Sequence, residues 1–127
     1  APLKSFDGSS VAKFEYNGNV LAPLPITTAQ FGQQWGSCPA TSPVRIQNQK
    51  VSSLDKFMQE CEKVGLHPIE AIGATNEGIC AGMLNGGSLV VLIHGKILSP
   101  GKVDLTVKAT DANLSGSLAL YLQNMMN

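Results

Sequence analysis

Residues 79–97 read ICAGMLNGGSLVVLIHGKI, and this stretch decides the predicted fold. Two apolar runs, 79–84 and 89–93, flank the linker Asn85-Gly86-Gly87-Ser88. Runs of this length around a short glycine-rich linker are typical of a β-hairpin. The second run is continuous rather than alternating, which indicates a strand covered on both faces. We therefore expect the hairpin to be the spine of the domain, with residues 89–93 as its central strand.

Further strands are predicted on either side of the hairpin. One is expected near residues 69–74, and another over 103–109, after the turn at 99–101. Apolar and polar residues alternate along 103–109, so one face of this strand should be buried while the other is wet. An alternating segment at 44–49 adds a strand earlier in the chain. Short turns between successive strands imply antiparallel pairing.

Three amphipathic segments are predicted to pack on this sheet as helices. The first ends near Trp35, the second covers residues 54–64, and the third follows residue 111. Each begins after a residue whose side chain can cap a helix, namely Thr27 or Thr28, Ser52 or Ser53, and Asp111. The helix 54–64 places apolar residues on one face and charged residues on the other, which should be solvated. This order of elements predicts an α+β domain, an antiparallel β-sheet flanked by α-helices.

A chain of 127 residues is about one domain. We assign residues 1–24 to an N-terminal arm or linker and residues 25–127 to the folded domain. Within the arm, residues 1–10 are expected to be frayed, and 11–16 and 20–24 can form a hairpin. Pro23 and Pro25 would confine the second strand of this hairpin to the edge of a sheet, because proline has no backbone N–H to donate.

The composition argues against several classes of protein. Nine basic and nine acidic side chains give a formal net charge of zero, and no stripe of Lys and Arg alternates with aromatic residues. A nucleic-acid partner is therefore not expected. No apolar run approaches the roughly 20 residues needed to cross a bilayer, and the N-terminus lacks the pattern of a signal peptide. We expect a cytoplasmic protein that does not insert directly into membranes.

The sequence shows no catalytic or metal-binding pattern. His67 and His94 are the two histidines, and neither belongs to a metal-binding spacing. We expect His94 at the edge of the core with a hydrogen-bond partner. Cys61 and Cys80 lie in apolar segments and should act as small hydrophobic residues, while Cys38, in the loop after the first helix, is the thiol most open to exposure. No cofactor and no enzymatic activity are expected.

Trp35 is the single tryptophan, and its surroundings differ from those of a core residue. Residues 33–37 read QQWGS, so polar or small side chains flank it, and Phe31 is its apolar neighbour along the helix. A tryptophan in this setting is expected to be partly exposed. Exposed tryptophans are favoured anchors for protein partners. Trp35 is therefore the candidate centre of a binding site.

The order and spacing of these elements resemble the carboxy-terminal platform subdomain of the β-adaptin appendages, the ears of adaptor protein complexes in vesicle coats. The similarity begins around Pro25 and covers the rest of the chain. It rests on the helix ending marked by Phe31, Trp35 and Pro39, the helix 54–64, the turns at 84–86 and 99–101, and the amphipathic helix that ends at Asn127. In detail the sequence is most similar to the β subunit of adaptor protein complex four, whose appendage resembles a platform alone. The resemblance implies a TATA-binding-protein-like fold for residues 25–127.

The resemblance also implies a function. In the clathrin-linked relatives, the platform binds short accessory-protein peptides through a tryptophan on its first helix, together with an aromatic residue, an arginine and acidic residues around the sheet. Trp35 matches the tryptophan, but an apolar run at 79–84 replaces the strand with the aromatic residue, and His94 lies roughly where an acidic residue is expected. These departures imply a more apolar groove for a hydrophobic peptide, such as that of tepsin. The predicted peptide-binding residues are Trp35, Ile79, Ala81 and Met83.

The resemblance places the full-length protein in the cytoplasm, peripheral on trans-Golgi network or endosomal membranes through the whole complex. Its expected partners are tepsin-like accessory peptides and, through the rest of the chain, other adaptor-complex subunits, while the domain itself should be a monomer. The residues alone leave two alternatives open. The domain could be a purely structural module in which Trp35 is buried, or a small thiol-dependent enzyme that uses Cys38.

Overall fold

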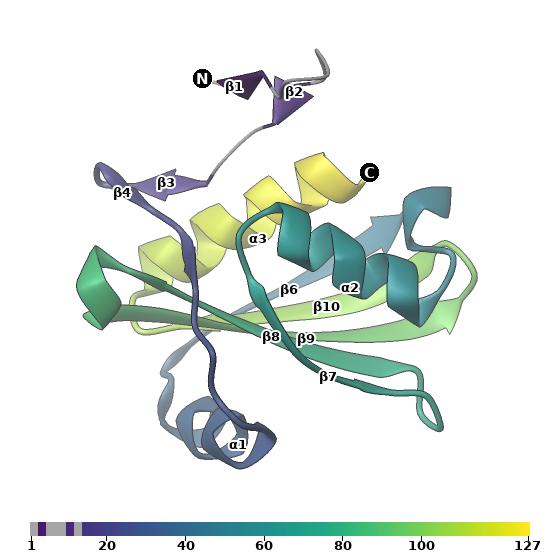
Figure 1. Cartoon of the computed structure of the whole chain (residues 1–127), viewed down its shortest axis with the longest axis horizontal. Coiled ribbons are helices and arrows are strands. Elements are labelled where there is room, and N and C mark those ends of the chain that lie inside the picture. The colour runs from purple at the N-terminus through teal and green to yellow at the C-terminus, as the bar shows by residue number, and fades with distance from the viewer. Residues whose placement is uncertain (1–2, 5–9, 12–13) are drawn as a thin grey trace.

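The computed structural model describes residues 3–4, 10–11 and 14–127. Within these residues the chain is α+β, as the sequence predicts, with an antiparallel main sheet and helices on both of its faces (Figure 1). The sheet has the order β5-β8-β9-β10-β6, and β7 pairs with the same edge of β8 as β5 does. Its strands are β5 (Ala22–Pro23), β6 (Ala40–Gln47), β7 (His67–Ile72), β8 (Glu77–Leu84), β9 (Leu89–Ser99) and β10 (Lys102–Ala109). The helices are α1 (Thr28–Ser37), α2 (Leu54–Lys63) and α3 (Ala112–Met126).

These helices divide unequally between the two faces of the sheet (Figure 1). α2 packs on β7 and β8, α3 packs on β6 and β10, and both lie on the same face. α1 lies on the opposite face, where it packs against β9. β9 is therefore the central strand with both faces covered, as its continuous apolar run predicts. Val91, Leu92 and Ile93 are all fully buried.

The predicted hairpin forms the centre of the sheet. Leu84 pairs with Leu89, and the linker between them is a short 3-10 turn, Asn85–Gly87. All three residues of this turn have positive φ angles, of 51°, 66° and 98°, which explains why the linker contains asparagine and glycine rather than bulkier residues. The strands predicted near 69–74 and 103–109 are present as β7 and β10. Strands β7 to β10 thus form an antiparallel meander.

The helices begin where the sequence places their caps, at Thr27, Ser53 and Asp111. At α1 the side chain of Thr27 accepts a hydrogen bond from the N–H of Gln30, and the side chain of Gln30 accepts one from the N–H of Thr27. This reciprocal capping box fixes the start of the helix. The helix ends at Ser37 rather than at the predicted Trp35, and its last backbone hydrogen bond is donated by the N–H of Cys38 to the carbonyl oxygen of Gln34.

The N-terminal segment is described in part. β1 (Leu3–Lys4) pairs with β2 (Ser10–Val11), and β3 (Glu15–Tyr16) pairs with β4 (Asn19–Val20). The second pair is a hairpin that turns at Asn17 and Gly18, between the segments predicted at 11–16 and 20–24, and both residues of the turn have positive φ. β5 lies at the edge of the main sheet, in agreement with the predicted effect of Pro23. The frayed arm predicted at 1–10 and the strand predicted at 11–16 fall partly outside the described residues.

The hydrophobic core has two parts, one on each face of the sheet. The larger part lies under α2 and α3 and includes Phe57, which is fully buried. The smaller part lies under α1 and consists of Phe31, Ile79, Ala81 and Leu92. Trp35 is among the half-buried side chains that pack around the smaller part. The α1 face is therefore the less completely covered side of the sheet.

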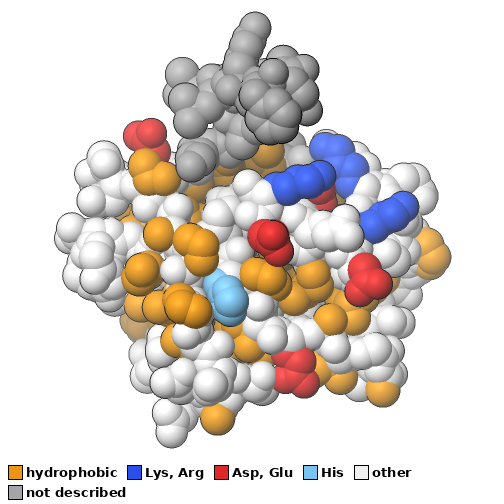
Figure 2. Space-filling model, in the orientation of Figure 1, with side chains coloured by type: hydrophobic (Ala, Val, Ile, Leu, Met, Phe, Trp, Pro, Cys, Tyr) orange, Lys and Arg blue, Asp and Glu red, His pale blue; other side chains and the backbone are white. Residues whose placement is uncertain are grey.

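The charged face of α2 is solvated, as predicted. Asp55, Lys56, Glu62 and Lys63 are all exposed. Figure 2 shows basic and acidic side chains interspersed over this helix, so neither sign forms a continuous patch there. As far as the chain is described, none of its helices has both the length and the apolar character needed to cross a membrane.

Candidate functional site

Cross-strand neighbours on the α1 face of the sheet form rows that run from β8 to β6. The charged row consists of Glu77, Lys96, Asp104 and Arg45. The border row consists of Ile79, His94, Thr106 and Pro43, and the covered row consists of Ala81, Leu92, Lys108 and Thr41. Opposite charges alternate along the charged row, which favours this register. α1 covers the residues of the covered and border rows that come from β8 and β9, namely Ala81, Leu92 and Ile79, and the charged row lies beyond the helix.

Trp35 lies near the end of α1, and three neighbouring side chains hold it at this border. Its ring stacks on Phe31, with 5.4 Å between the ring centroids, and meets the His94 ring edge-on at 6.2 Å. The ammonium group of Lys108 lies 4.8 Å from the indole centroid and donates a 3.0 Å hydrogen bond to the Trp35 carbonyl oxygen. A cation over an aromatic face stabilises the ring position. The indole is thereby oriented while remaining half-buried, as predicted.

A cavity of about 270 Å³ opens beside the indole, and we call it the tryptophan pocket. It is lined by Phe31, Gly32, Trp35 and His94. A Cβ at Gly32 would meet no atom within 4 Å, so the space beside this residue is open. Three of the four lining residues contribute aromatic rings. The pocket therefore suits one aromatic or large aliphatic side chain of a partner.

His94, in the border row, is held in place by Glu77, in the adjacent charged row. Its Nε2 lies 2.7 Å from Oε2 of Glu77, so the predicted core-edge histidine does have a hydrogen-bond partner. This bond from His94, with a second from Thr75, holds the pKa of Glu77 below its usual value. The carboxylate thus orients the imidazole that forms one wall of the tryptophan pocket.

The Glu77 carboxylate should make the stability of the domain sensitive to acid. A pKa that is lower in the folded than in the unfolded chain contributes stability above the unfolded value, and this contribution is lost as the pH falls through the folded value. Denaturant unfolding of wild type and Glu77→Gln should therefore differ most above the pH at which a free Glu titrates, about 4.3, and the difference should shrink as the pH falls below it. A difference that stayed constant over this range would contradict the assignment.

The structure separates the four residues predicted to bind peptide. Trp35 lies at the surface, where its ring lines the tryptophan pocket. Ile79 and Ala81 point to the same face of β8, but they lie beneath α1 with 6% and 0% of their surface exposed. Met83 follows on the same face, opposite Val90, and is half-buried. The two buried residues can therefore support the pocket from below, whereas direct contact is open to Trp35 and Met83.

Phe31, Gly32 and His94 line the pocket but are not among the predicted binding residues. The helical spacing contained part of the signal, because positions 31, 32 and 35 share one side of a helix. His94 comes from β9, and nothing local in the sequence connects it with α1. It reaches the pocket because α1 packs on β8 and β9 with Trp35 beside His94.

The cysteines are not placed as activated nucleophiles. Cys38 is half-buried, and burial raises the pKa of its thiol, against an opposing effect of Lys108. A reactive thiolate needs the opposite shift. Cys61 and Cys80 are buried, as predicted, and burial raises the pKa of Cys61. Among the described residues, no group of His, Cys, Asp or Glu side chains is arranged to hold a metal ion.

The antiparallel sheet with two helices on one face, and one helix with a half-exposed tryptophan on the other, corresponds to an adaptin appendage platform. Residues 23–125 match the model of a family described as the adaptin AP4 complex epsilon appendage platform. The chain belongs to this family, so the predicted adaptor appendage platform is confirmed. No curated protein and no solved structure matches the chain.

The family corrects the predicted subunit, because it is the epsilon subunit and not the β subunit of complex four. The residues that carry the resemblance build α1, α2, the central hairpin and the turns, so they report the platform fold and do not distinguish the subunits. Appendage platforms are protein-interaction domains of adaptor-complex subunits. Family membership therefore gives this domain a protein-interaction role in vesicle trafficking, on a cytoplasmic coat peripheral to the membrane.

Proposed function

We propose that this domain docks short hydrophobic peptide segments of accessory proteins at the tryptophan pocket. One observation carries the proposal: a half-buried indole, fixed from the sheet side by Lys108, lines a cavity of about 270 Å³ together with Phe31 and His94. Pre-oriented aromatic residues beside a small cavity are typical anchors of protein interfaces. The anchor expected from the partner is a phenylalanine or a similarly large apolar side chain.

The four predicted binding residues take different roles in this proposal. Trp35 contacts the peptide, and Met83, half-buried on the same face of β8, lies further along that strand. Ile79 and Ala81 form the packed floor on which α1 rests, and Ile79 pairs directly with His94. Their substitution should therefore weaken binding by moving α1 rather than by removing a contact.

Tepsin-derived peptides are the first probes for this function. Short linear motifs that bind near micromolar have a binding free energy of about −8 kcal/mol, so loss of one aromatic anchor should be measurable. Trp35→Ala should weaken binding at least about tenfold in calorimetry, because the face of the pocket that carries the indole is lost. Chemical-shift mapping of the wild type should place the strongest changes at α1 and around His94.

Leu120→Ala is the matched control for this experiment. Leu120 is the most exposed large hydrophobic residue recorded in the described chain, at 59%, and it lies on α3, on the opposite side of the sheet. Its loss should leave peptide binding unchanged. Normal binding by Trp35→Ala, or an equal loss in both variants, would contradict the proposed site. The thermal midpoint of each variant shows whether it remains folded.

The same proposal covers the domain boundaries and the setting of the full-length protein. Residues 25–127 are the platform, and residues 1–24 are an N-terminal arm that includes the edge strand β5. The platform acts as a monomer, while other parts of the full-length subunit contact the remaining adaptor-complex subunits. Its work takes place on trans-Golgi network or endosomal membranes, to which the whole complex is attached.

A further inference from the structure

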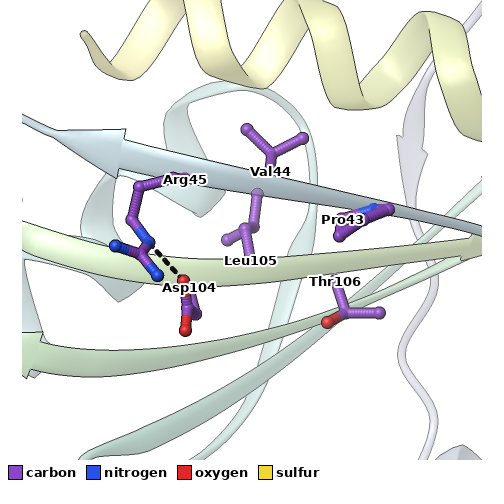
Figure 3. A pocket seen from close by; sticks show the side chains of 6 residues that line it. All are labelled: Pro43, Val44, Arg45, Asp104, Leu105 and Thr106. Carbon is purple, nitrogen blue, oxygen red and sulfur yellow. Dashed lines mark hydrogen bonds and ion pairs between the residues drawn. The ribbon is translucent and has the colours of Figure 1, made fainter.

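The outer edge of β6 is open to solvent. This eight-residue strand ends the sheet, and no other strand of the described chain pairs with its outer side. A second cavity, of about 390 Å³, lies over β6 and its neighbour β10 (Figure 3). It is lined by Pro43, Val44, Arg45, Asp104, Leu105 and Thr106. An open strand edge of this length presents a row of backbone N–H and C=O groups to which another chain can pair.

The register of β6 shows which of its backbone groups point outward. The N–H of Asn48 donates to the carbonyl oxygen of Gly101 over 2.8 Å, and these two residues continue the unbroken register in which Gln47 lies opposite Lys102. Hydrogen-bonded and non-hydrogen-bonded pairs alternate along an antiparallel ladder. The even-numbered residues of β6 therefore bond to β10. The outward-pointing residues are the odd-numbered ones, all of them exposed: Thr41, Pro43, Arg45 and Gln47.

Two of these four outward positions have no free N–H group. Pro43 has none because it is a proline. The N–H of Gln47 donates a 2.8 Å hydrogen bond to Oδ1 of Asn127, which follows the last turn of α3. The end of α3 is held at this strand by a second contact, a 3.1 Å hydrogen bond from Nζ of Lys50 to the carbonyl oxygen of Met125. A side chain of the helix end thus takes the place that an added strand would need.

The two donors that remain, the N–H groups of Thr41 and Arg45, are separated by Pro43 and lie about 13 Å apart at 3.3 Å per residue. A second copy of this chain would pair its β6 with this one antiparallel about a two-fold axis. In the central registers of such a pair, Pro43 lies opposite either itself or Arg45. The second of these registers also needs the N–H of Gln47. The middle of the new ladder would therefore lack hydrogen bonds in either register.

We propose that the outer edge of β6 is a pairing surface for a second copy of this chain, and that Pro43 and Asn127 keep it closed. Pro43 interrupts the edge at its centre, and the side chain of Asn127 occupies its end. Proteins commonly protect exposed sheet edges with prolines and with covering segments. The inference is independent of the tryptophan pocket, and it gives a physical reason for the monomeric state proposed above.

Amide hydrogen exchange of the 127-residue chain, followed residue by residue by NMR, tests the hydrogen-bond pattern. The N–H of Arg45 should exchange at least about a hundredfold faster than those of Val44 and Ile46, because these two are bonded within the sheet. The N–H of Gln47 should be protected in wild type and lose its protection in Asn127→Ala, while Val44 stays unchanged. Equal protection of Val44 and Arg45 would mean that the edge is not open.

Pro43→Val combined with Asn127→Ala should open the edge, since both blocked positions then carry a free N–H. In sedimentation velocity this double variant should form a dimer whose fraction rises with concentration, whereas wild type remains a monomer. The N–H of Arg45 should become protected in the dimer, because the second β6 now accepts its hydrogen bond. Adding Arg45→Pro to the double variant should restore the monomer, because a proline again removes an outward donor from the middle of the strand.

Pro39→Val is the matched control, because Pro39 is an exposed proline that precedes β6 and lies outside the ladder. It should remain a monomer. A double variant that is folded by circular dichroism but stays monomeric, or equal association of Pro39→Val, would overturn the proposal. If the double variant does not fold, the exchange rates of wild type and Asn127→Ala decide the question. Peptide binding that depends on Trp35 is a separate measurement, so the docking function stands or fails independently of these results.

Discussion

Replacing Phe57 with alanine should lower the free energy of unfolding by about 3–5 kcal/mol, the usual cost of deleting a buried phenylalanine ring. Phe57 projects from α2 into the larger core and is fully buried. Its ring lies directly against the backbone of Gly78 and Gly95, which pair across β8 and β9. The two glycines have no side chain of their own to fill this space, because both positions lack a Cβ. A cavity would therefore remain between the helix and the central strands.

Urea unfolding followed by circular dichroism measures this effect. Lys56→Ala is the matched control, because Lys56 precedes Phe57 in the same helix and is exposed. Its effect should stay within about 0.5 kcal/mol. Phe57→Leu should fall between the two, since a smaller side chain leaves a smaller cavity. A loss in Phe57→Ala no greater than that of the control would mean that this ring does not hold α2 on the sheet.

Gly95→Ala should destabilise the domain by about 1–3 kcal/mol, through overpacking rather than through a cavity. A Cβ at position 95 would lie 2.4 Å from Cζ and 2.6 Å from Cε2 of Phe57. These are ring atoms of a fully buried side chain, so they cannot swing into solvent. The effect is steric, because Gly95 is not one of the glycines with positive φ. The close approach of α2 to β9 is the reason for a glycine in the middle of a central strand.

Two further variants separate this clash from other effects of alanine. Gly116→Ala is the control, since a Cβ there meets no atom within 4 Å and the residue lies within α3. It should stabilise the domain by about 0.5–1 kcal/mol, the helix preference of alanine over glycine. Gly95→Ala combined with Phe57→Leu should cost less than the sum of the two single changes, because the smaller side chain relieves the clash. Strict additivity, or a neutral Gly95→Ala, would contradict this packing.

The unequal coverage of the sheet connects the fold with the proposed function. α2 and α3 together cover one face, and the glycine pair under Phe57 lets α2 lie close to it. On the other face α1 covers Ile79, Ala81 and Leu92, so the rest of the border row and the charged row stay accessible beyond the helix. The tryptophan pocket forms where this cover ends. If a second helix covered this face, the border of α1 would be buried and the tryptophan pocket would not be accessible to a peptide.

Local sequence patterns were sufficient for most of the elements. Asn85, Gly86 and Gly87 determined the central turn because they tolerate positive φ, and the apolar runs around them determined the hairpin. Thr27, Ser53 and Asp111 determined where the helices begin, because a cap needs a side-chain acceptor at one position. These preferences act within a few residues of the chain, so tertiary packing did not alter the turn or the helix starts that they predict.

Long-range pairing decided what the sequence left open. Alternation showed that Ile79, Ala81 and Met83 share a face, but only the packing of α1 on that face buried Ile79 and Ala81.

Other contacts came from residues far apart in the chain. β6 joins β10 at the far edge of the sheet, and this brings Arg45 to Asp104 across 59 positions of sequence. His94 reaches Trp35 in the same way, from a different strand.

The sequence by itself thus determined the elements, their caps and the half-exposed tryptophan, because these depend on local backbone preferences and on which residues alternate. The tertiary structure alone decided the two cavities, the charged row and the neighbours of Trp35. Each of these depends on which strands pair and in which register, and the whole core, rather than any single segment, selects that register.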